Sequence, residues 1–248
     1  MRMRKRHNLE PRMEKCAELL VREPESYKGK WKSAFADSRE LHLELGCGKG
    51  RFTVEAAGAA PELLLVALEK VPDAMVIAME RARDAGLRNL RFIDGDAADL
   101  ADIFDKGEVD RIYINFCDPW PKSRDAKFRL TAPSFLRLYC QLLPIGGQIH
   151  FKTDNGPLFD WSVDQLRAEL WQLSELTEDL HAPGMPATFV TDYEQKFMDG
   201  GVRINRLVAE RTGETKGFSA GAVPRIRNAA LADARGGLQP PLPEDRDI

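Results

Sequence analysis

From residue 41 onward, short apolar segments alternate with longer amphipathic ones, and this alternation is the feature that most restricts the fold. Strands are predicted at 41–45, 63–68, 89–93, 110–116, 148–152, 173–176 and 203–209, and helices at 51–60, 72–85, 133–143 and 158–170. The segment 63–68 is apolar throughout, as expected of a parallel strand that is covered on both faces. The pattern predicts an α/β domain with a doubly wound sheet and right-handed crossovers.

Composition divides the chain into three parts. Residues 1–35 form a basic N-terminal segment with a short helix expected at 14–21, and residues 36–212 hold the α/β domain. Residues 213–248 are rich in Gly, Ala, Arg and Pro and have too few apolar residues to order themselves. We therefore expect a flexible C-terminal tail, with a short helix around 227–235.

The charge distribution is uneven. The formal net charge is −3 and the isoelectric point is near 5.9, which argues against a purely electrostatic nucleic-acid binder. Residues 1–32, however, hold ten Lys and Arg against five acids, and residues 122–129 hold four against one. Basic patches on an acidic body suit a protein that touches a polyanion at chosen places.

Membrane, metal and disulfide classes are disfavoured. No apolar run approaches the ~20 residues of a membrane span, and acids follow the basic start where a signal peptide needs apolar residues. The four cysteines are far apart and form no C-x-x-C pair; they are Cys16, Cys47, Cys117 and Cys140. The four histidines form no metal-binding cluster. We therefore expect a cytoplasmic protein with free thiols and no bound metal.

A glycine-rich turn joins the first predicted strand to the first helix. Gly46, Gly48 and Gly50 allow the backbone to turn sharply and approach a bound nucleoside closely. Dinucleotide sites use G-x-G-x-x-G, whereas the spacing here is G-x-G-x-G with Glu44 just ahead. A carboxylate there repels a phosphate and attracts the cationic amino-acid part of S-adenosylmethionine. An NAD-dependent oxidoreductase is thereby disfavoured.

Further acids end the next strands along the chain. Glu69 follows the second predicted strand, where it can accept both ribose hydroxyls of a nucleoside, and Asp94 and Asp96 follow the third. These side chains are expected at one edge of the sheet, because the carboxyl ends of parallel strands meet there. The predicted cofactor is S-adenosylmethionine.

The fourth predicted strand ends in a stiff acidic loop. Pro119 and Pro121 restrict the backbone around Asp118, so this carboxylate is held in place at the ligand-binding edge. A basic run able to neutralise phosphates follows directly and contains Lys122, Arg124, Lys127 and Arg129.

Four motifs at characteristic spacing make the chain similar to a known family. They are Tyr27-Lys28-Gly29-Lys30-Trp31, Asp118-Pro119-Trp120-Pro121-Lys122-Ser123-Arg124, His150-Phe151-Lys152-Thr153-Asp154-Asn155 and Thr191-Asp192-Tyr193-Glu194-Gln195-Lys196-Phe197. Over residues 1–211 the chain resembles the bacterial tRNA (guanine-N7-)-methyltransferases. The resemblance implies a Rossmann-like methyltransferase fold, with a mostly parallel seven-stranded sheet covered by helices on both faces.

The resemblance also implies the activity and the roles of individual residues. The expected reaction moves a methyl group from S-adenosylmethionine to N7 of guanine 46 in the tRNA variable loop, with Asp118 as the catalytic residue. The cofactor-binding residues include two of the three glycines of the turn and are Glu44, Gly46, Gly48, Glu69, Asp96 and Asp118. The substrate-binding residues are Lys122, Asp154, Thr191, Asp192, Tyr193 and Glu194, and the basic run contacts RNA through Arg124, Lys127 and Arg129.

The chain departs from the family pattern in the basic run. Asp125, Ala126 and Phe128 stand where the family usually carries further bases and a histidine, which weakens the predicted phosphate patch. Two alternatives stay open: an RNA amino-group methyltransferase, whose D-P-P-aromatic loop Asp118-Pro119-Trp120 partly resembles, and a non-catalytic RNA-binding protein. The sequence allows either a monomer or a homodimer.

The predicted chemistry matches the residue types available. Guanine N7 attacks with a lone pair and carries no proton, so no general base is required at the attacking atom. What the reaction needs is alignment of the reactants and a fixed negative charge near the purine as it becomes positive. Asp118 can supply that charge by accepting from the guanine N1–H and amine, while Asp154 and Tyr193 can assist or can simply cap and pack.

Overall fold

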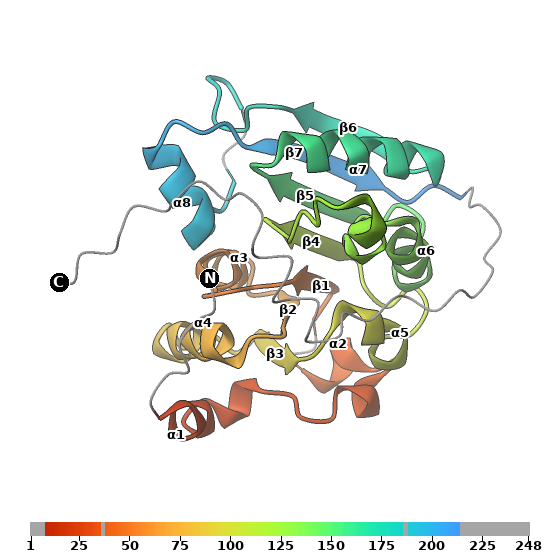
Figure 1. The fold of residues 1–248 in the computed structure, drawn as a ribbon. Helices are drawn as coiled ribbons and strands as arrows, with labels where there is room; N and C mark the ends of the chain where they lie inside the picture. Colours follow the sequence, from red (N-terminus) through yellow and green to blue (C-terminus); the bar gives the residue numbers. More distant parts are fainter. Residues whose placement is uncertain (1–7, 36–37, 186–187, 214–248) are drawn as a thin grey trace.

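The structure, a computed structural model, describes residues 8–35, 38–185 and 188–213, so the predicted tail and its helix at 227–235 lie outside the described part except for Gly213. A seven-stranded sheet with strand order β3-β2-β1-β4-β5-β7-β6 runs through the middle of the molecule (Figure 1). The strands are β1 Glu40–Leu45, β2 Leu63–Glu69, β3 Leu90–Asp94, β4 Arg111–Asn115, β5 Gln148–Thr153, β6 Gln172–Thr177 and β7 Asn205–Glu210. Five strands pair in parallel, and β7 runs antiparallel between β5 and β6.

Helices cover both faces of this sheet (Figure 1). They are α1 Leu9–Glu14, α2 Trp31–Ala34, α3 Arg51–Ala59, α4 Pro72–Asp84, α5 Leu100–Ile103, α6 Pro133–Leu142, α7 Gly156–Ala168 and α8 Asp192–Asp199. Alternate residues of β2 divide between two apolar clusters: Leu65 and Ala67 belong to the cluster that includes α3 and α4, whereas Val66 belongs to the cluster that includes α5, α6 and α7. In the described ranges no helix is both long and apolar enough to span a bilayer.

The strand register brings the predicted site segments together. Glu69 at the end of β2 is level with Asp94 of β3, and Asn115 at the end of β4 is level with Lys152 of β5. The strand order changes direction between β1 and β4, because β2 and β3 lie on one side and β5 on the other. Ligands of doubly wound folds bind in the crevice at such a switch point.

The N-terminal segment differs from the sequence prediction. The helix expected at 14–21 is wrong, because α1 ends at Glu14 and only a 3₁₀ turn, Ala17–Leu19, follows. Leu20 then forms a parallel bridge with Phe92 of β3, and Val21 donates a backbone hydrogen bond to the Phe92 carbonyl at 2.9 Å. Pairing with the edge of the sheet therefore keeps this stretch extended.

The helix α8 was not predicted from the sequence. It begins at Asp192 behind a Thr191–Glu194 capping box, in which each residue satisfies a backbone amide of the other. The capping signal is readable in the sequence, but a helix of only eight residues is too short for its apolar periodicity to stand out.

Candidate active site

Two adjoining pockets open at the carboxyl ends of the strands. The first pocket, with a volume of about 230 Å³, is lined by Glu69, Asp96 and Asp118 together with apolar side chains. The second pocket, of about 290 Å³, lies between the glycine turn and α8. The two linings share three residues, which are Gly46, Asn115 and Phe116. These residues line both pockets, so ligands bound in the two pockets would lie next to each other.

The glycine turn is tied to the tip of β2. Gly46, Gly48 and Gly50 all have positive φ, at 82°, 57° and 79°, a region that side chains disfavour. At Gly50 a Cβ would also lie 2.4 Å from the Cβ of Ala78, so glycine is required where α3 meets α4. The Gly48 amide donates to a carboxylate oxygen of Glu69 at 2.8 Å.

Glu69 retains capacity to bind a ligand. Its second oxygen accepts from the backbone amide of Val71 at 2.9 Å, and burial raises the pKa of the carboxyl. A carboxylate can accept about four hydrogen bonds, and three backbone amides, those of Gly48, Lys70 and Val71, act on this one, so it can still accept a ribose hydroxyl in the first pocket. Asp96 lines the same pocket and accepts from the Ala98 amide at 2.9 Å.

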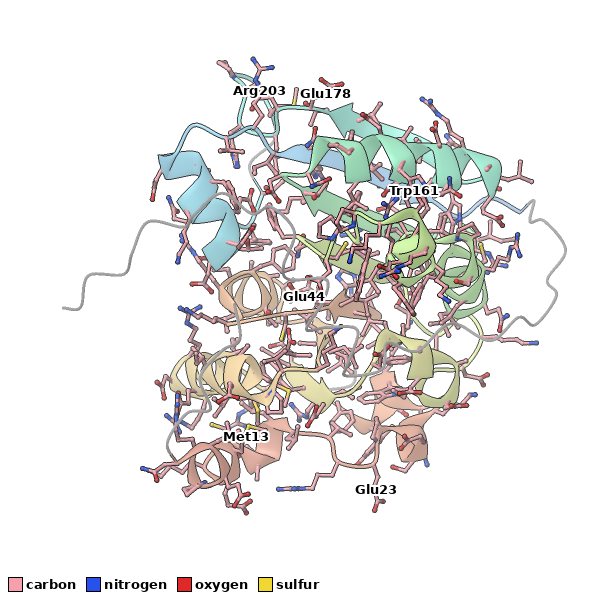
Figure 2. All side chains as sticks on the ribbon, in the orientation of Figure 1. Met13, Glu23, Glu44, Trp161, Glu178 and Arg203 are labelled. Carbon is pink, nitrogen blue, oxygen red and sulfur yellow. The ribbon has the colours of Figure 1, made fainter. Side chains whose placement is uncertain are left out.

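Glu44 is buried near the centre of the molecule (Figure 2). Thr53 donates to it through Oγ1 at 2.6 Å, and Asn115 donates through Nδ2 at 3.2 Å. Burial raises the pKa of Glu44 to about 7, although these two hydrogen bonds and the charge of Lys152 oppose the rise. A cation bound in the adjoining second pocket would favour the ionised carboxylate.

The loop that carries Asp118 is held in an unusual conformation. Phe116 and Trp120, on either side of Asp118, have φ of 53° and 43°, which costs of order 1–3 kcal/mol each for residues of this type. Arg129 stabilises the loop by donating to the carbonyls of Pro119 and Trp120, both at 2.9 Å. The Asp118 side chain itself is exposed to the first pocket.

Arg129 therefore has a different environment from the rest of the basic run. Its guanidinium lies over the ring of Trp161, with 4.4 Å to the centroid, and burial lowers its pKa. Lys122, Arg124 and Lys127 are exposed, and Arg124 lies 3.8 Å from Asp125. The expectation that these four residues contact RNA stays a prediction, and Arg129 additionally supports the Asp118 loop.

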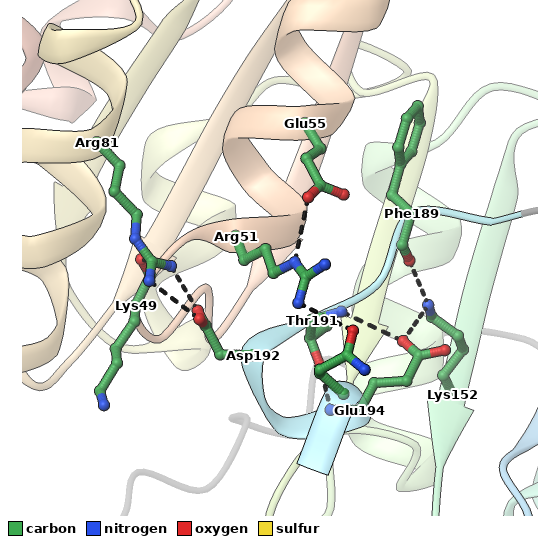
Figure 3. A network of polar contacts seen from close by, with 10 residues as sticks. Lys49, Arg51, Glu55, Arg81, Lys152, Phe189, Thr191, Asp192 and Glu194 are labelled. Atoms are coloured by element: carbon green, nitrogen blue, oxygen red, sulfur yellow. Dashed lines mark hydrogen bonds and ion pairs between the residues drawn. The ribbon is translucent and has the colours of Figure 1, made fainter. Parts of the chain in front are cut away.

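The residues of the Thr191–Phe197 motif lie beside the second pocket. Asp192 accepts two hydrogen bonds from Arg81, at 2.6 and 3.0 Å, and this partner keeps the pKa of Asp192 low although burial acts in the opposite direction (Figure 3). The Tyr193 ring lies 5.3 Å from that of Phe116. Burial raises the pKa of Tyr193 to about 12, and the nearby charges of Asp154 and Asp118 add to the effect.

Glu194, by contrast, is completely buried in a network of polar contacts. One carboxylate oxygen accepts from Lys152 Nζ at 2.8 Å and from the Thr191 amide at 3.3 Å (Figure 3). The other oxygen lies 3.0 Å from His181. Lys152 also donates to the carbonyl of Phe189 at 2.8 Å. Sequence analysis did not assign Lys152 a role, although it lies within one of the quoted motifs.

Asp154, the remaining expected substrate residue, lies just beyond the end of β5. Asn155, not Asp154, caps α7 by accepting from the Leu158 amide at 2.8 Å. The Asp154 side chain is half-buried, which raises the pKa of its carboxyl. Asp154 lines neither pocket, although its charge helps to raise the pKa of Tyr193.

The two pockets differ in the charges that line them. The first is lined by three acids and one lysine, Lys70, and suits a cationic ligand. The second has three basic residues in its lining, Lys49, Arg51 and Lys196, against two acids, of which Glu44 is buried and Asp192 is already paired with Arg81. It suits an anionic partner at its rim. In the described part of the chain no group of three or more His, Cys, Asp or Glu side chains could hold a metal.

This fold and site define a Rossmann-like methyltransferase. The Methyltransf_4 family, described as "Putative methyltransferase", matches residues 38–207. The tRNA (guanine-N(7)-)-methyltransferase of Bacillus cytotoxicus is 40% identical over 210 residues, 85% of this chain and 97% of the relative. That of Listeria welshimeri is 39% identical over 210 residues, 85% of this chain and 98% of the relative. The chain belongs to the tRNA (guanine-N7-)-methyltransferase family.

A solved structure agrees with this assignment at the level of the fold. The 16S rRNA methyltransferase KamB superimposes with a TM-score of 0.54 at 17% identity, covering 74% of this chain and 92% of that chain. The predicted fold class, a mostly parallel seven-stranded sheet with helices on both faces, is confirmed.

Proposed function

We propose that this protein transfers the methyl group of S-adenosylmethionine to N7 of a guanine in tRNA, at position 46 of the variable loop. The relatives at 39–40% identity support the tRNA substrate and the N7 position, because they carry that activity in their names. The expectation of guanine 46 comes from the family resemblance.

The observation that carries the proposal is the pair of oppositely charged pockets with a common wall at Gly46, Asn115 and Phe116. A sulfonium donor and an RNA acceptor have opposite charges, and their reacting atoms must come within about 3–3.5 Å of each other. Adjoining pockets of opposite sign meet both requirements.

The residues of the first pocket fit the donor. Glu69 and Asp96 have acceptor capacity for hydroxyl and amine groups, and the glycine turn admits close approach of a nucleoside. Glu44 on the other side of Gly46 suits the cationic amino-acid portion. When bound, S-adenosylmethionine supplies an electrophilic methyl group on a positively charged sulfur.

The protein's own residues orient the base and stabilise charge. Asp118 lines the first pocket two residues beyond Phe116, on a loop held by Arg129, and its charge acts on Tyr193 of the second pocket. A guanine that enters from the second pocket would donate its N1–H and amine to this carboxylate, which would offset the positive charge that appears on the ring. Tyr193, packed against Phe116 at the common wall, offers an aromatic surface to the base. No side chain needs to remove a proton from N7.

A single assay tests the whole proposal. The full-length protein is incubated with an unmodified tRNA transcript and methyl-labelled S-adenosylmethionine, and the product is mapped by reduction and aniline cleavage, which cuts at N7-methylguanosine. The expected result is one cut at position 46 and no label in a transcript with adenine at that position.

Three other outcomes would contradict the proposal in different ways. Label retained in the adenine-46 transcript would place the target elsewhere in the tRNA. Recovery of an amino-methylated nucleoside by digestion and mass spectrometry would indicate the exocyclic-amine reaction. Binding of both ligands without transfer would indicate a non-catalytic RNA-binding protein.

A further inference from the structure

Two lysines outside the predicted basic run line the second pocket. Lys49 lies in the glycine turn and Lys196 lies on α8, and both are exposed. Within the described ranges, no carboxylate lies at ion-pair distance from either ammonium group, whereas the neighbouring Asp192 is paired with Arg81. The rim of this pocket therefore carries positive charge that the protein itself does not neutralise.

One guanidinium fixes the two lysine-bearing segments relative to each other. Arg81 donates to the backbone carbonyl of Lys49 at 2.9 Å and to both carboxylate oxygens of Asp192, the first residue of α8. Arg51 adds a second link by donating to Gln195 at 3.2 Å. In Figure 3 the Lys49 side chain extends away from this network, which holds its backbone and leaves the ammonium free.

From this arrangement we propose that Lys49 and Lys196 bind the phosphodiester backbone of the RNA beside the target nucleotide. The inference rests on the proposed function, because the second pocket must be the one that receives the guanine. A nucleotide whose base enters a pocket leaves its own phosphates at the rim, where cations bind them. The basic run at 122–129 lies outside this lining, so the two lysines form a separate contact.

The contact also fits the composition of the basic run. Asp125 and Phe128 remove two positions at which that run could carry charge, and Arg129 is occupied with the loop carbonyls of Pro119 and Trp120. Phosphate binding at Lys49 and Lys196 adds two cations on the other side of Phe116 and Tyr193. The RNA backbone is then held on both sides of the base.

The experiment compares full-length wild-type protein, a Lys49→Gln/Lys196→Gln variant and a control variant, Arg88→Gln/Lys106→Gln. Arg88 and Lys106 are also exposed, but they precede β3 and β4 and so lie at the opposite edge of the sheet. Both variants lose two positive charges. Binding of unmodified tRNA is measured by filter retention at several salt concentrations, and donor binding by calorimetry.

The pocket variant should bind tRNA roughly tenfold to a hundredfold more weakly at 0.1 M salt, and its salt slope should fall by about 1.4–1.8, since each phosphate contact contributes about 0.7–0.9. The control should keep a slope near that of the wild type, and donor affinity should stay within twofold in both variants. Equal slopes in the two variants would overturn the inference. Failure of the wild-type protein to bind or methylate tRNA would instead overturn the proposed function.

Discussion

The ammonium of Lys152 lies 2.8 Å from a carboxylate oxygen of Glu194, and both side chains are buried. This ion pair joins the end of β5 to the capping box of α8, and α8 carries Tyr193 against Phe116. Glu194 has no surface left for RNA. Its contribution to the site is therefore to hold α8 in place, which differs from the direct substrate contact implied by the family resemblance.

Lys152→Met should lower the free energy of unfolding far more than the double change Lys152→Met/Glu194→Met. The single variant removes the lysine partner of a carboxylate that stays buried beside His181 and the Thr191 amide. Breaking a buried ion pair in this way costs about 3–5 kcal/mol, whereas replacing both partners by apolar residues is often close to neutral. The free energy of unfolding is measured by urea titration. The double variant should recover most of the stability, and it should show a raised KM for tRNA because α8 is released.

A control for this pair is Glu169→Gln, which disrupts the Arg137–Glu169 ion pair between α6 and α7. Glu169 is also buried, but it lies away from both pockets. It should lower stability without raising the KM for tRNA. If the double variant and this control have the same KM for tRNA, the Lys152–Glu194 ion pair has no specific role in positioning α8.

Asp118→Ala should lower kcat by at least ~100-fold, the lower end of the effect of a group that acts in the transition state. The side chain is exposed, so the melting temperature should change little. Methyl transfer to tRNA is measured with labelled donor. Asp118→Asn is the matched variant, because it keeps the shape and removes the charge. Near-wild-type turnover in either variant would remove Asp118 from the mechanism.

Glu44→Gln should stabilise the protein while weakening donor binding. The pKa of about 7 means that the folded state holds this proton more tightly than the unfolded chain, for which the ordinary value is 4.5. Wild-type stability is therefore lost as pH rises from about 4.5 to 7 and stays lower above that. The variant lacks this loss, so at pH 8 its free energy of unfolding should exceed that of the wild type by up to about 3 kcal/mol.

The same substitution should alter the pH dependence of donor affinity. Ionised Glu44 attracts the cationic donor, so wild-type affinity should rise between pH 6 and 7.5 as the carboxyl loses its proton. Calorimetric titrations across this range should show a smaller rise for Glu44→Gln. Equal pH profiles of donor affinity in the wild type and the variant would show that the charge of Glu44 does not affect donor binding.

Arg129→Met should lower kcat through the Asp118 loop. It removes two hydrogen bonds to the carbonyls of Pro119 and Trp120, so the loop can relax from its left-handed conformations. Turnover should fall about 10- to 100-fold, because a small displacement of a catalytic group is enough for a loss of this size. The salt slope of tRNA binding separates this role from the predicted RNA contact, because loss of loop support alone leaves the slope unchanged. A slope lowered by about one would indicate a direct phosphate contact instead.

Replacing Lys122, Arg124 and Lys127 by Gln should weaken tRNA binding and leave kcat nearly unchanged. These side chains are exposed and do not support the Asp118 loop, so kcat at saturating tRNA should change little. Affinity for tRNA should fall, and its salt slope should drop by about 2–3, as measured by filter retention. An unchanged slope would mean that the RNA backbone runs elsewhere on the surface.

The ends of all the predicted strands lie within two residues of the observed ends, because the apolar residues that mark a strand lie within the strand itself. The stretch 63–68 is apolar without interruption and becomes buried β2. The acids Glu69, Asp96 and Asp118 meet in one pocket for the same reason: parallel strands bring their carboxyl ends to one edge. This part of the candidate site is readable from spacing alone.

The partners of the charged side chains could not be read in this way. Arg129 and Lys127 both belong to the basic run, yet one holds a loop and the other is exposed. Glu194 and Asp192 share a motif, yet Glu194 is buried on Lys152 and Asp192 pairs with Arg81 at the rim. A charge is compatible with water or with a buried partner, and only the meeting of distant segments decides between them. The sequence by itself therefore determined the sheet and the acidic edge, because apolar periodicity is a local property. The tertiary structure alone decided which charges face the ligands and which hold the site together.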